Sequence, residues 1–257
     1  MGSEMCIRDS SKDVKFTDVT EDYCCLGLFG PKSREMISSI SSDDFSNENF
    51  KFGTAKFVKI DDVQIWAQRI SYVGELGFEL YVKKENALKL FDILMNKGKS
   101  FKISLCGMHA MDIMRMESGY LHWGHDISPE ENQFEAGLSF AISFKKNINF
   151  IGRAALEKKR DKKDHKKFKM LILNNSKEGA PLLLHDEPIY LKDKIVGRTT
   201  SGCYSFNYNK NLAFGYINSG LSSNEIDKEA FEIEIEKKKY QASVITRPLN
   251  DKKLNSL

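Results

Sequence analysis

Two kinds of hydrophobic pattern divide the chain, a mixed pattern up to about residue 157 and a β-type pattern from about residue 168. In the first part, residues 85–97 carry apolar side chains at helical spacing and are followed by Gly98, which is typical of an amphipathic helix with a glycine stop. The same reasoning predicts strands over 22–30, 54–60, 63–72 and 71–80, and helices over 31–40, 85–97, 105–117 and 154–159.

Residues 71–80, SYVGELGFEL, combine two glycines, two glutamates and two aromatic residues. On an extended backbone Phe78 and Leu80 share one face, whereas Glu79 and Tyr81 share the other, so Glu79 can face a ligand while its neighbours pack inward. Glycine weakens an ordinary strand, and two of them indicate a bulge or a close backbone approach. The stretch alone is equally consistent with an edge strand whose glutamates are solvated.

The second part consists of short β-type runs separated by turn residues, which is typical of a small antiparallel barrel or sandwich. The runs are 168–173, 188–191, 194–200, 211–217, 231–235 and 239–245. The segment 158–167 is strongly basic but of mixed sign, and we interpret it as a solvated linker.

The segment 119–126, GYLHWGHD, has more aromatic and titratable groups than a simple connection needs. Tyr120 and Trp123 offer rigid faces with polar tips, which favours a flat heterocyclic ligand. His122 and His125 form too loose a cluster with Asp126 to indicate a metal site. In the preceding helix, Asp112 and Arg115 are three residues apart and would be neighbours, either as a surface pair or positioned at a cavity.

Composition excludes several classes of function. A net charge of +3 and widely spread lysines do not favour nucleic-acid binding, and no apolar run is long enough to cross a membrane. Five cysteines without metal-like spacing indicate reduced thiols in a cytoplasmic protein. Residues 1–10 lack the apolar core of a signal peptide and are interpreted as a non-native scar.

Several of these segments together resemble the aminomethyltransferase (glycine cleavage T-protein) superfamily, and most closely the C-terminal tetrahydrofolate-binding half of dimethylglycine and sarcosine dehydrogenases. The resemblance runs in order from about residue 12 to 248. The matching segments are YCCLGLFGPKSRE (23–35), RISYVGELGFELYV (69–82), AMDIMRMESGYLHWGHDISPEE (110–131), FEAGLSFAI (134–142), FIGRAAL (150–156), EPIYLKDKIVGRTTSGCYS (187–205) and LAFGYI (212–217).

The resemblance implies an α+β fold, with a folate-binding domain over 11–157, the linker, and a small antiparallel β-barrel over 168–250. Tyr72 and Glu79 match the tyrosine and glutamate that contact the pterin end of the folate in this family, and Tyr120 matches another position of the folate pocket. Glu75 is an alternative to Glu79. The interpretation of the residues themselves adds Trp123 as a stacking surface.

The chain also departs from the family pattern. Asp112 and Arg115 match, but Met111 stands where the T-protein has an arginine, so the folate glutamate tail would be held differently or not at all. The family's catalytic aspartate has no equivalent here, because it lies upstream of the matched region. The flavin domain of the dehydrogenases, which binds FAD, has no counterpart either, and the resemblance therefore implies a fragment.

The implied reaction captures a one-carbon unit from a small-molecule amine donor on tetrahydrofolate, giving 5,10-methylenetetrahydrofolate. An N-terminal flavin domain or a flavoprotein subunit is the implied partner. Two alternatives stay open: a folate-binding assembly or regulatory protein, and a folate-dependent demethylase of a sulfonium or methoxy donor. The cysteine-containing glycine motif of the iron-sulfur assembly relatives is missing from VGELGFE, which counts against the first alternative.

Overall fold

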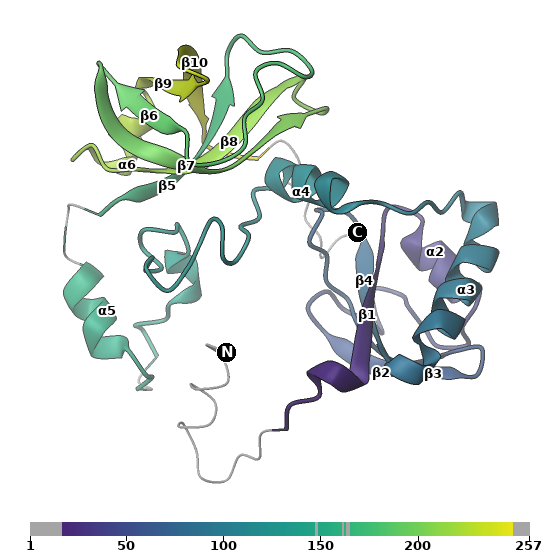
Figure 1. The fold of residues 1–257 in the computed structure, drawn as a ribbon. Helices are drawn as coiled ribbons and strands as arrows, with labels where there is room; N and C mark the ends of the chain where they lie inside the picture. Colours follow the sequence, from purple (N-terminus) through teal and green to yellow (C-terminus); the bar gives the residue numbers. More distant parts are fainter. Residues whose placement is uncertain (1–16, 147–148, 161, 163–164, 249–257) are drawn as a thin grey trace. The chain divides into compact units, whose positions relative to one another are not determined.

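The computed structural model describes residues 17–146, 149–160, 162 and 165–248. The chain divides into two units, Met1–Met111 with Asp251–Leu257, and Asp112–Asn250 (Figure 1). We call them the sheet unit and the barrel unit. The first ten residues, interpreted above as a scar, lie outside the described residues, as does part of the basic segment 158–167.

The sheet unit is built on four antiparallel strands in the order β1-β4-β3-β2. Two α-helices and short 3-10 turns complete the elements that lie wholly within it (Figure 1). The elements are η1 (Thr20–Asp22), β1 (Tyr23–Phe29), α2 (Ser33–Ser38), β2 (Ala55–Ile60), β3 (Val63–Gln68), β4 (Gly77–Lys83), η2 (Lys84–Asn86), α3 (Ala87–Gly98) and η3 (Lys99–Phe101).

One face of this sheet is apolar and carries the core, as the period-two pattern predicts. Phe78, Leu80 and Val82 of β4 are fully buried there, together with Ile37 of α2 and Leu90 of α3. The two helices therefore pack on this face, and alternate residues of the strands are left on the other one. The predicted strands and helices of this unit are present, but their ends differ from the prediction by up to four residues in β1, α2, β2, β3 and α3.

The stretch 71–80 is a strand only from Gly77 onward, so the strand prediction for its first six residues is wrong. Residues 72–76 form bends, and Gly74 has a φ of +72°, a backbone conformation that an extended strand cannot contain. The predicted alternation does hold where the strand exists, since Phe78 and Leu80 are buried and Glu79 is half-buried.

The barrel unit contains a closed barrel of six antiparallel strands in the order β10-β5-β8-β7-β6-β9, which confirms the predicted barrel (Figure 1). Helix α4 leads into the unit, since the division falls after Met111, and α5 precedes the barrel. The elements are α4 (Met108–Glu117), η4 (Ser139–Ala141), α5 (Arg153–Arg160), β5 (Lys167–Leu173), β6 (Pro188–Leu191), β7 (Lys194–Ser205), β8 (Lys210–Ile217), α6 (Ser223–Ile226), β9 (Ala230–Ile235) and β10 (Lys238–Ile245).

Along the barrel strands, side chains that fill the interior alternate with side chains on the outer face. Leu171 of β5 and Ile217 of β8 belong to the interior cluster. Met170, next to Leu171, and Phe214, three positions before Ile217, belong to a second cluster with Met116 of α4. Helix α4 is thus anchored to the outer face of β5 and β8 by its last turn.

Helix α5 continues through Arg160, so the first residues of the predicted linker are helical.

Candidate functional site

The sheet unit presents one carboxylate in the middle of its second face. Glu79 on β4 is half-buried, and its neighbour two residues on, Tyr81, donates a hydrogen bond from its hydroxyl to Glu79 Oε2 at 2.7 Å. Cys25 of β1 lies opposite Tyr81 in the strand register. Burial first, and then the hydrogen bond to Glu79, raise the pKa of Tyr81, so its hydroxyl remains a donor at neutral pH.

Two glycines make room for an aromatic ring beside this carboxylate. Phe29 lies opposite Gly77 in the register, and a Cβ on Gly77 would stand 2.2 Å from its ring. A Cβ on Gly27, which lies opposite Glu79, would stand 2.5 Å from the same ring. The ring of Phe29 therefore lies flat across both strands. This is the physical reason for a glycine in β4 and for the absence of a side chain facing Glu79 from β1.

The other two predicted residues of this unit lie in the irregular segment before β4. Tyr72 and Glu75 are both half-buried and belong to the bends between Gln68 and Gly77. Gly74 turns the chain between them with its positive φ. Of the three predicted residues, only Glu79 lies on a strand, and Tyr72 and Glu75 lie in the bends that lead into it.

In the barrel unit, Asp126 is the centre of a buried hydrogen-bond network. Its carboxylate accepts from Thr200 Oγ1 at 2.6 Å and Ser201 Oγ at 2.8 Å through one oxygen. The other oxygen accepts from Arg115 Nη1 at 2.5 Å and the backbone amide of His122 at 2.8 Å. Asp126 is 1% exposed, so this carboxylate is used in holding the segment 119–126 against strand β7 rather than in binding a ligand.

The guanidinium N–H groups of Arg115 donate hydrogen bonds to other groups of the protein. It is 2% exposed and donates to Asp112 Oδ1 at 3.0 Å, to the carbonyl of Tyr120 at 3.1 Å and to Ser201 Oγ at 2.9 Å, besides its ion pair with Asp126. The predicted pairing of Asp112 with Arg115 is confirmed. Through these bonds Arg115 orients the carboxylate of Asp112 and fixes the backbone at Tyr120.

The aromatic and imidazole groups of the segment 119–126 remain accessible. Trp123 is 63% exposed, and the rings of His122 and His125 lie 4.6 Å apart. Nδ1 of His122 stands 3.9 Å from Asp112 Oδ1. The part of the chain that the structure describes contains no group of three or more side chains arranged to hold a metal ion. Among the same residues, no helix is long and apolar enough to span a membrane.

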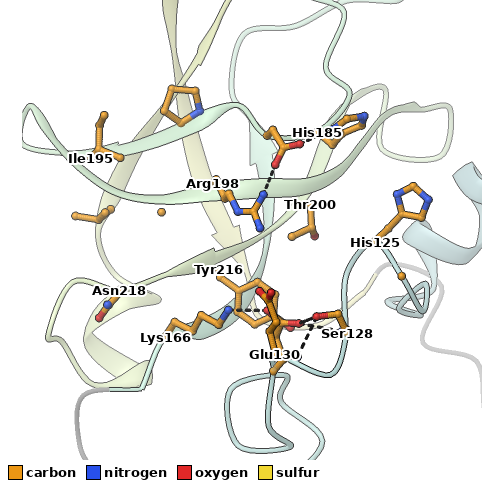
Figure 2. A pocket seen from close by; sticks show the side chains of 16 residues that line it. His125, Ser128, Glu130, Lys166, His185, Ile195, Arg198, Thr200, Tyr216 and Asn218 are labelled. Atoms are coloured by element: carbon orange, nitrogen blue, oxygen red, sulfur yellow. Dashed lines mark hydrogen bonds and ion pairs between the residues drawn. The ribbon is translucent and has the colours of Figure 1, made fainter. Parts of the chain in front are cut away.

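A cavity of about 660 Å³ opens beside the barrel in the same unit, lined by residues of the segment after Gly124 and of β6, β7 and β8 (Figure 2). Lys166 lies over the ring of Tyr216, 4.8 Å from its centroid, and pairs with Glu131 at 2.6 Å. Tyr216 and Thr200 direct their hydroxyls to Asp126. Lys166, Thr200 and Tyr216 therefore have partners within the protein.

The sequence interpretation missed three residues that shape these arrangements. Local patterns place Asp126 only in a loose cluster with two histidines, and Tyr81 only beside Glu79 on a strand. They do not single out Tyr216. The alternation in β4 could have linked Tyr81 to Glu79, because residues two apart share a face. The partners of Asp126 on β7 are 74 and 75 residues away, and no local pattern reveals them.

Thiol reactivity offers a test of the environments of these residues. Burial and the charge of Glu79 raise the pKa of Cys25, and burial raises that of Cys203 to about 12. A raised thiol pKa leaves less thiolate at neutral pH. Cys25 and Cys106 are both exposed, so alkylation by iodoacetamide should be slower at Cys25 than at Cys106 because of its thiol pKa, and slowest at the half-buried Cys203. Peptide mass spectrometry over pH 7 to 10 measures the three rates. Equal rates at Cys25 and Cys106 would contradict the contact with Glu79.

Comparisons with known proteins agree with this architecture. The family model described as the GCVT N-terminal domain matches residues 3–146, and the glycine cleavage T-protein C-terminal barrel domain matches residues 166–251. Human mitochondrial dimethylglycine dehydrogenase is 35% identical over 92% of this chain and 27% of its own length. The aminomethyltransferase of Listeria welshimeri is 31% identical over 95% of this chain and 64% of its own length.

A solved structure shares the fold. The crystal structure of the glycine cleavage system aminomethyltransferase T from Bartonella henselae superposes with a TM-score of 0.75 at 20% identity, covering 88% of this chain and 59% of that one. The chain spans about a quarter of the length of the dehydrogenase relative named above. With both domain types matched in order along the sequence, the chain belongs to the glycine cleavage T-protein family of aminomethyltransferases.

Proposed function

We propose that this chain binds tetrahydrofolate and takes part in the transfer of an amine-derived one-carbon unit to it, giving 5,10-methylenetetrahydrofolate. The observation that carries the proposal is the single carboxylate of Glu79, half-buried among aromatic side chains on the open face of a sheet. Family membership and relatives named dimethylglycine dehydrogenase and aminomethyltransferase support the same class of reaction.

The residues present suit a pterin. Its amino group and ring N–H are adjacent donors, and a carboxylate accepts such a pair through two oxygens. Glu79 Oε2 takes one hydrogen bond from Tyr81, which leaves lone pairs on that oxygen and the whole of Oε1 for a ligand. In the proposal Tyr72 contributes an aromatic face, and Glu75 is the alternative acceptor.

Three further residues, all in the barrel unit, are proposed folate-binding residues on the ground of their chemistry and their place in the matched sequence segments. Asp112, Tyr120 and Trp123 offer a carboxylate, a phenol and an exposed indole. Arg115 bonds the carboxylate of Asp112 and the backbone carbonyl of Tyr120. Arg115 itself has its donors engaged, so its proposed part is to position these residues. Bound tetrahydrofolate would supply the nucleophilic nitrogen that receives the one-carbon unit. The protein groups bind and orient it.

The proposed donor is a small methylated amine such as dimethylglycine or sarcosine. The proposal assigns no catalytic residue and no FAD site to this chain, and oxidation of the amine would be the task of a flavin domain or a flavoprotein subunit. The four cysteines among the described residues are free, which favours a reducing compartment such as the cytoplasm, although the dehydrogenase relative named above is mitochondrial.

Isothermal titration with tetrahydrofolate tests the proposal. Glu79→Gln keeps the size of the side chain but removes its charge and one acceptor, so binding should weaken by about 10- to 100-fold, the value of a hydrogen bond to a charged group. Glu85→Gln, an exposed position in η2, is the matched control and should bind like the wild type. Absence of wild-type binding would contradict the function. Equal affinities of wild type and Glu79→Gln would contradict the site.

A further inference from the structure

The open face of the sheet contains one hydrogen bond between side chains that the proposed function leaves unexplained. Glu79 and Tyr81 are two residues apart on β4, so their side chains leave the sheet in the same direction. The tyrosine hydroxyl reaches back along the strand and donates to Glu79 Oε2 at 2.7 Å. A buried or half-buried hydroxyl needs such a partner, but the choice of this carboxylate ties the two residues together.

The neighbouring strands offer Glu79 little other restraint. Its partner on β1 is Gly27, which has no side chain, and its partner on β3 is Gln68. Among the hydrogen bonds of the described residues, the one from Tyr81 is the only bond given to the Glu79 carboxylate. A glutamate side chain has several rotatable bonds, and an exposed one samples many rotamers.

We propose that Tyr81 is a positioning residue that holds the carboxylate of Glu79 in the orientation required by the ligand. The inference rests on the proposed folate-binding function and deepens it. The bond occupies one lone pair of Oε2 and fixes the plane of the carboxylate. Oε1 and the second lone pair of Oε2 then face away from Tyr81 as a ready acceptor pair for two adjacent N–H donors.

The position of Tyr81 is itself secured by β1. Cys25 stands opposite it in the strand register, so the backbone of β1 pairs with β4 at this position. The hydrogen bond given to the Tyr81 hydroxyl among the described residues goes to the carboxylate of Glu79 on its own strand. Since a carboxylate is a stronger acceptor than a thiol, the hydroxyl proton points to Glu79, and Cys25 is dispensable for the orientation of the carboxylate.

The ligand arm of the test uses Tyr81→Phe, which keeps the ring and removes only the hydroxyl. Titration with tetrahydrofolate should show about tenfold weaker binding for Tyr81→Phe, from losing pre-organisation of Glu79. In a Glu79→Gln background the same substitution should have much less effect, because the residue it positions is already impaired. Cys25→Ala is the matched control and should bind like the wild type.

The second arm of the test measures the hydrogen bond between Tyr81 and Glu79 in the absence of a ligand. Tyr81 titrates above the ordinary pKa of tyrosine, partly through its bond to Glu79. An ultraviolet titration of the wild type, minus that of Tyr81→Phe, isolates this one phenol, and Glu79→Gln should move its ionisation to lower pH. An unmoved ionisation would show that the phenol of Tyr81 is not in contact with the Glu79 carboxylate.

The outcomes separate this inference from the function on which it rests. Weaker binding by Tyr81→Phe, not additive with Glu79→Gln, together with the shifted titration, would support it. A wild type that binds tetrahydrofolate and a Tyr81→Phe variant of equal affinity would overturn the inference alone. Additive losses in the double variant or an unmoved phenol titration would overturn it as well. Failure of the wild type to bind would overturn the proposed function and this inference together.

Discussion

Replacing Arg115 with methionine should destabilise the barrel unit by about 3–5 kcal/mol, the cost of breaking a buried ion pair and leaving one charge without its partner. The substitution removes the guanidinium from Asp126, which is 1% exposed and cannot recover water in its place. It also removes the donors to Ser201, Asp112 and the Tyr120 carbonyl. Methionine fills a similar volume, so the loss would report the charge and its bonds.

Arg69 of the sheet unit provides the matched control, because it is a second buried arginine in the opposite electrostatic situation. It is 1% exposed and donates from Nη1 to the Phe50 carbonyl, but its Nε and Nη2 have no hydrogen-bond partner among the described residues. Burial and the charge of Arg34 lower its pKa. Arg69→Met gives up one hydrogen bond and relieves an unfavourable buried charge, so its effect should be within about 1 kcal/mol of zero.

Urea denaturation followed by circular dichroism measures both variants. Native-state hydrogen exchange of amides in the barrel strands distinguishes the stability of the barrel unit from that of the sheet unit. A loss below about 1 kcal/mol for Arg115→Met would show that the Asp126 network is not a stabilising element. A loss for Arg69→Met as large as that for Arg115→Met would show that its guanidinium has a partner that balances its burial.

Alanine at Gly197 should be the second severe substitution, with a loss of about 3 kcal/mol or more from overpacking. A Cβ at this position of β7 would stand 1.9 Å from the carbonyl oxygen of Tyr216 on β8, and 3.2 Å from the Cα of Ile217. Both contacts are backbone atoms of a paired strand, so no side-chain rotation relieves them. The strands would have to separate locally, next to the bulge between Thr199 and Ser201.

Gly107→Ala is the control for this prediction. A Cβ there meets no heavy atom within 4 Å, and its φ is not in the positive range. Gly107 precedes α4 and its carbonyl accepts from the backbone amide of Met111, so alanine should cost no more than about 1 kcal/mol, the usual effect of a poor N-cap. Thermal unfolding of the two variants beside the wild type gives the comparison. If both variants melted with the wild type, the close approach of β7 and β8 at Gly197 would be refuted.

Local patterns predicted the barrel strands well. The predicted strands 188–191 and 231–235 agree with β6 and β9 to within one residue, because each strand alternates between a filled interior and an outer face. The helix at 85–97 was predicted to within two residues from its apolar stripe. The predicted stop at Gly98 is wrong, because Gly98 is itself helical and a 3-10 turn continues to Phe101 before Lys102 takes the left-handed conformation. The stretch 71–76 was predicted wrongly as a strand, since a turn set by the positive φ of Gly74 leaves no periodic signal.

The sequence by itself determined the order of helices and strands, the two-part organisation and the face of β4 that carries Glu79, since each depends on residues only a few positions apart. The tertiary structure decided which polar groups meet. Asp126 became a buried acceptor for β7, and Tyr81 met Cys25 across the β1–β4 register. Such contacts join residues some 55 to 75 positions apart, and their pairing depends on strand order and register, which hydrophobic periodicity does not encode.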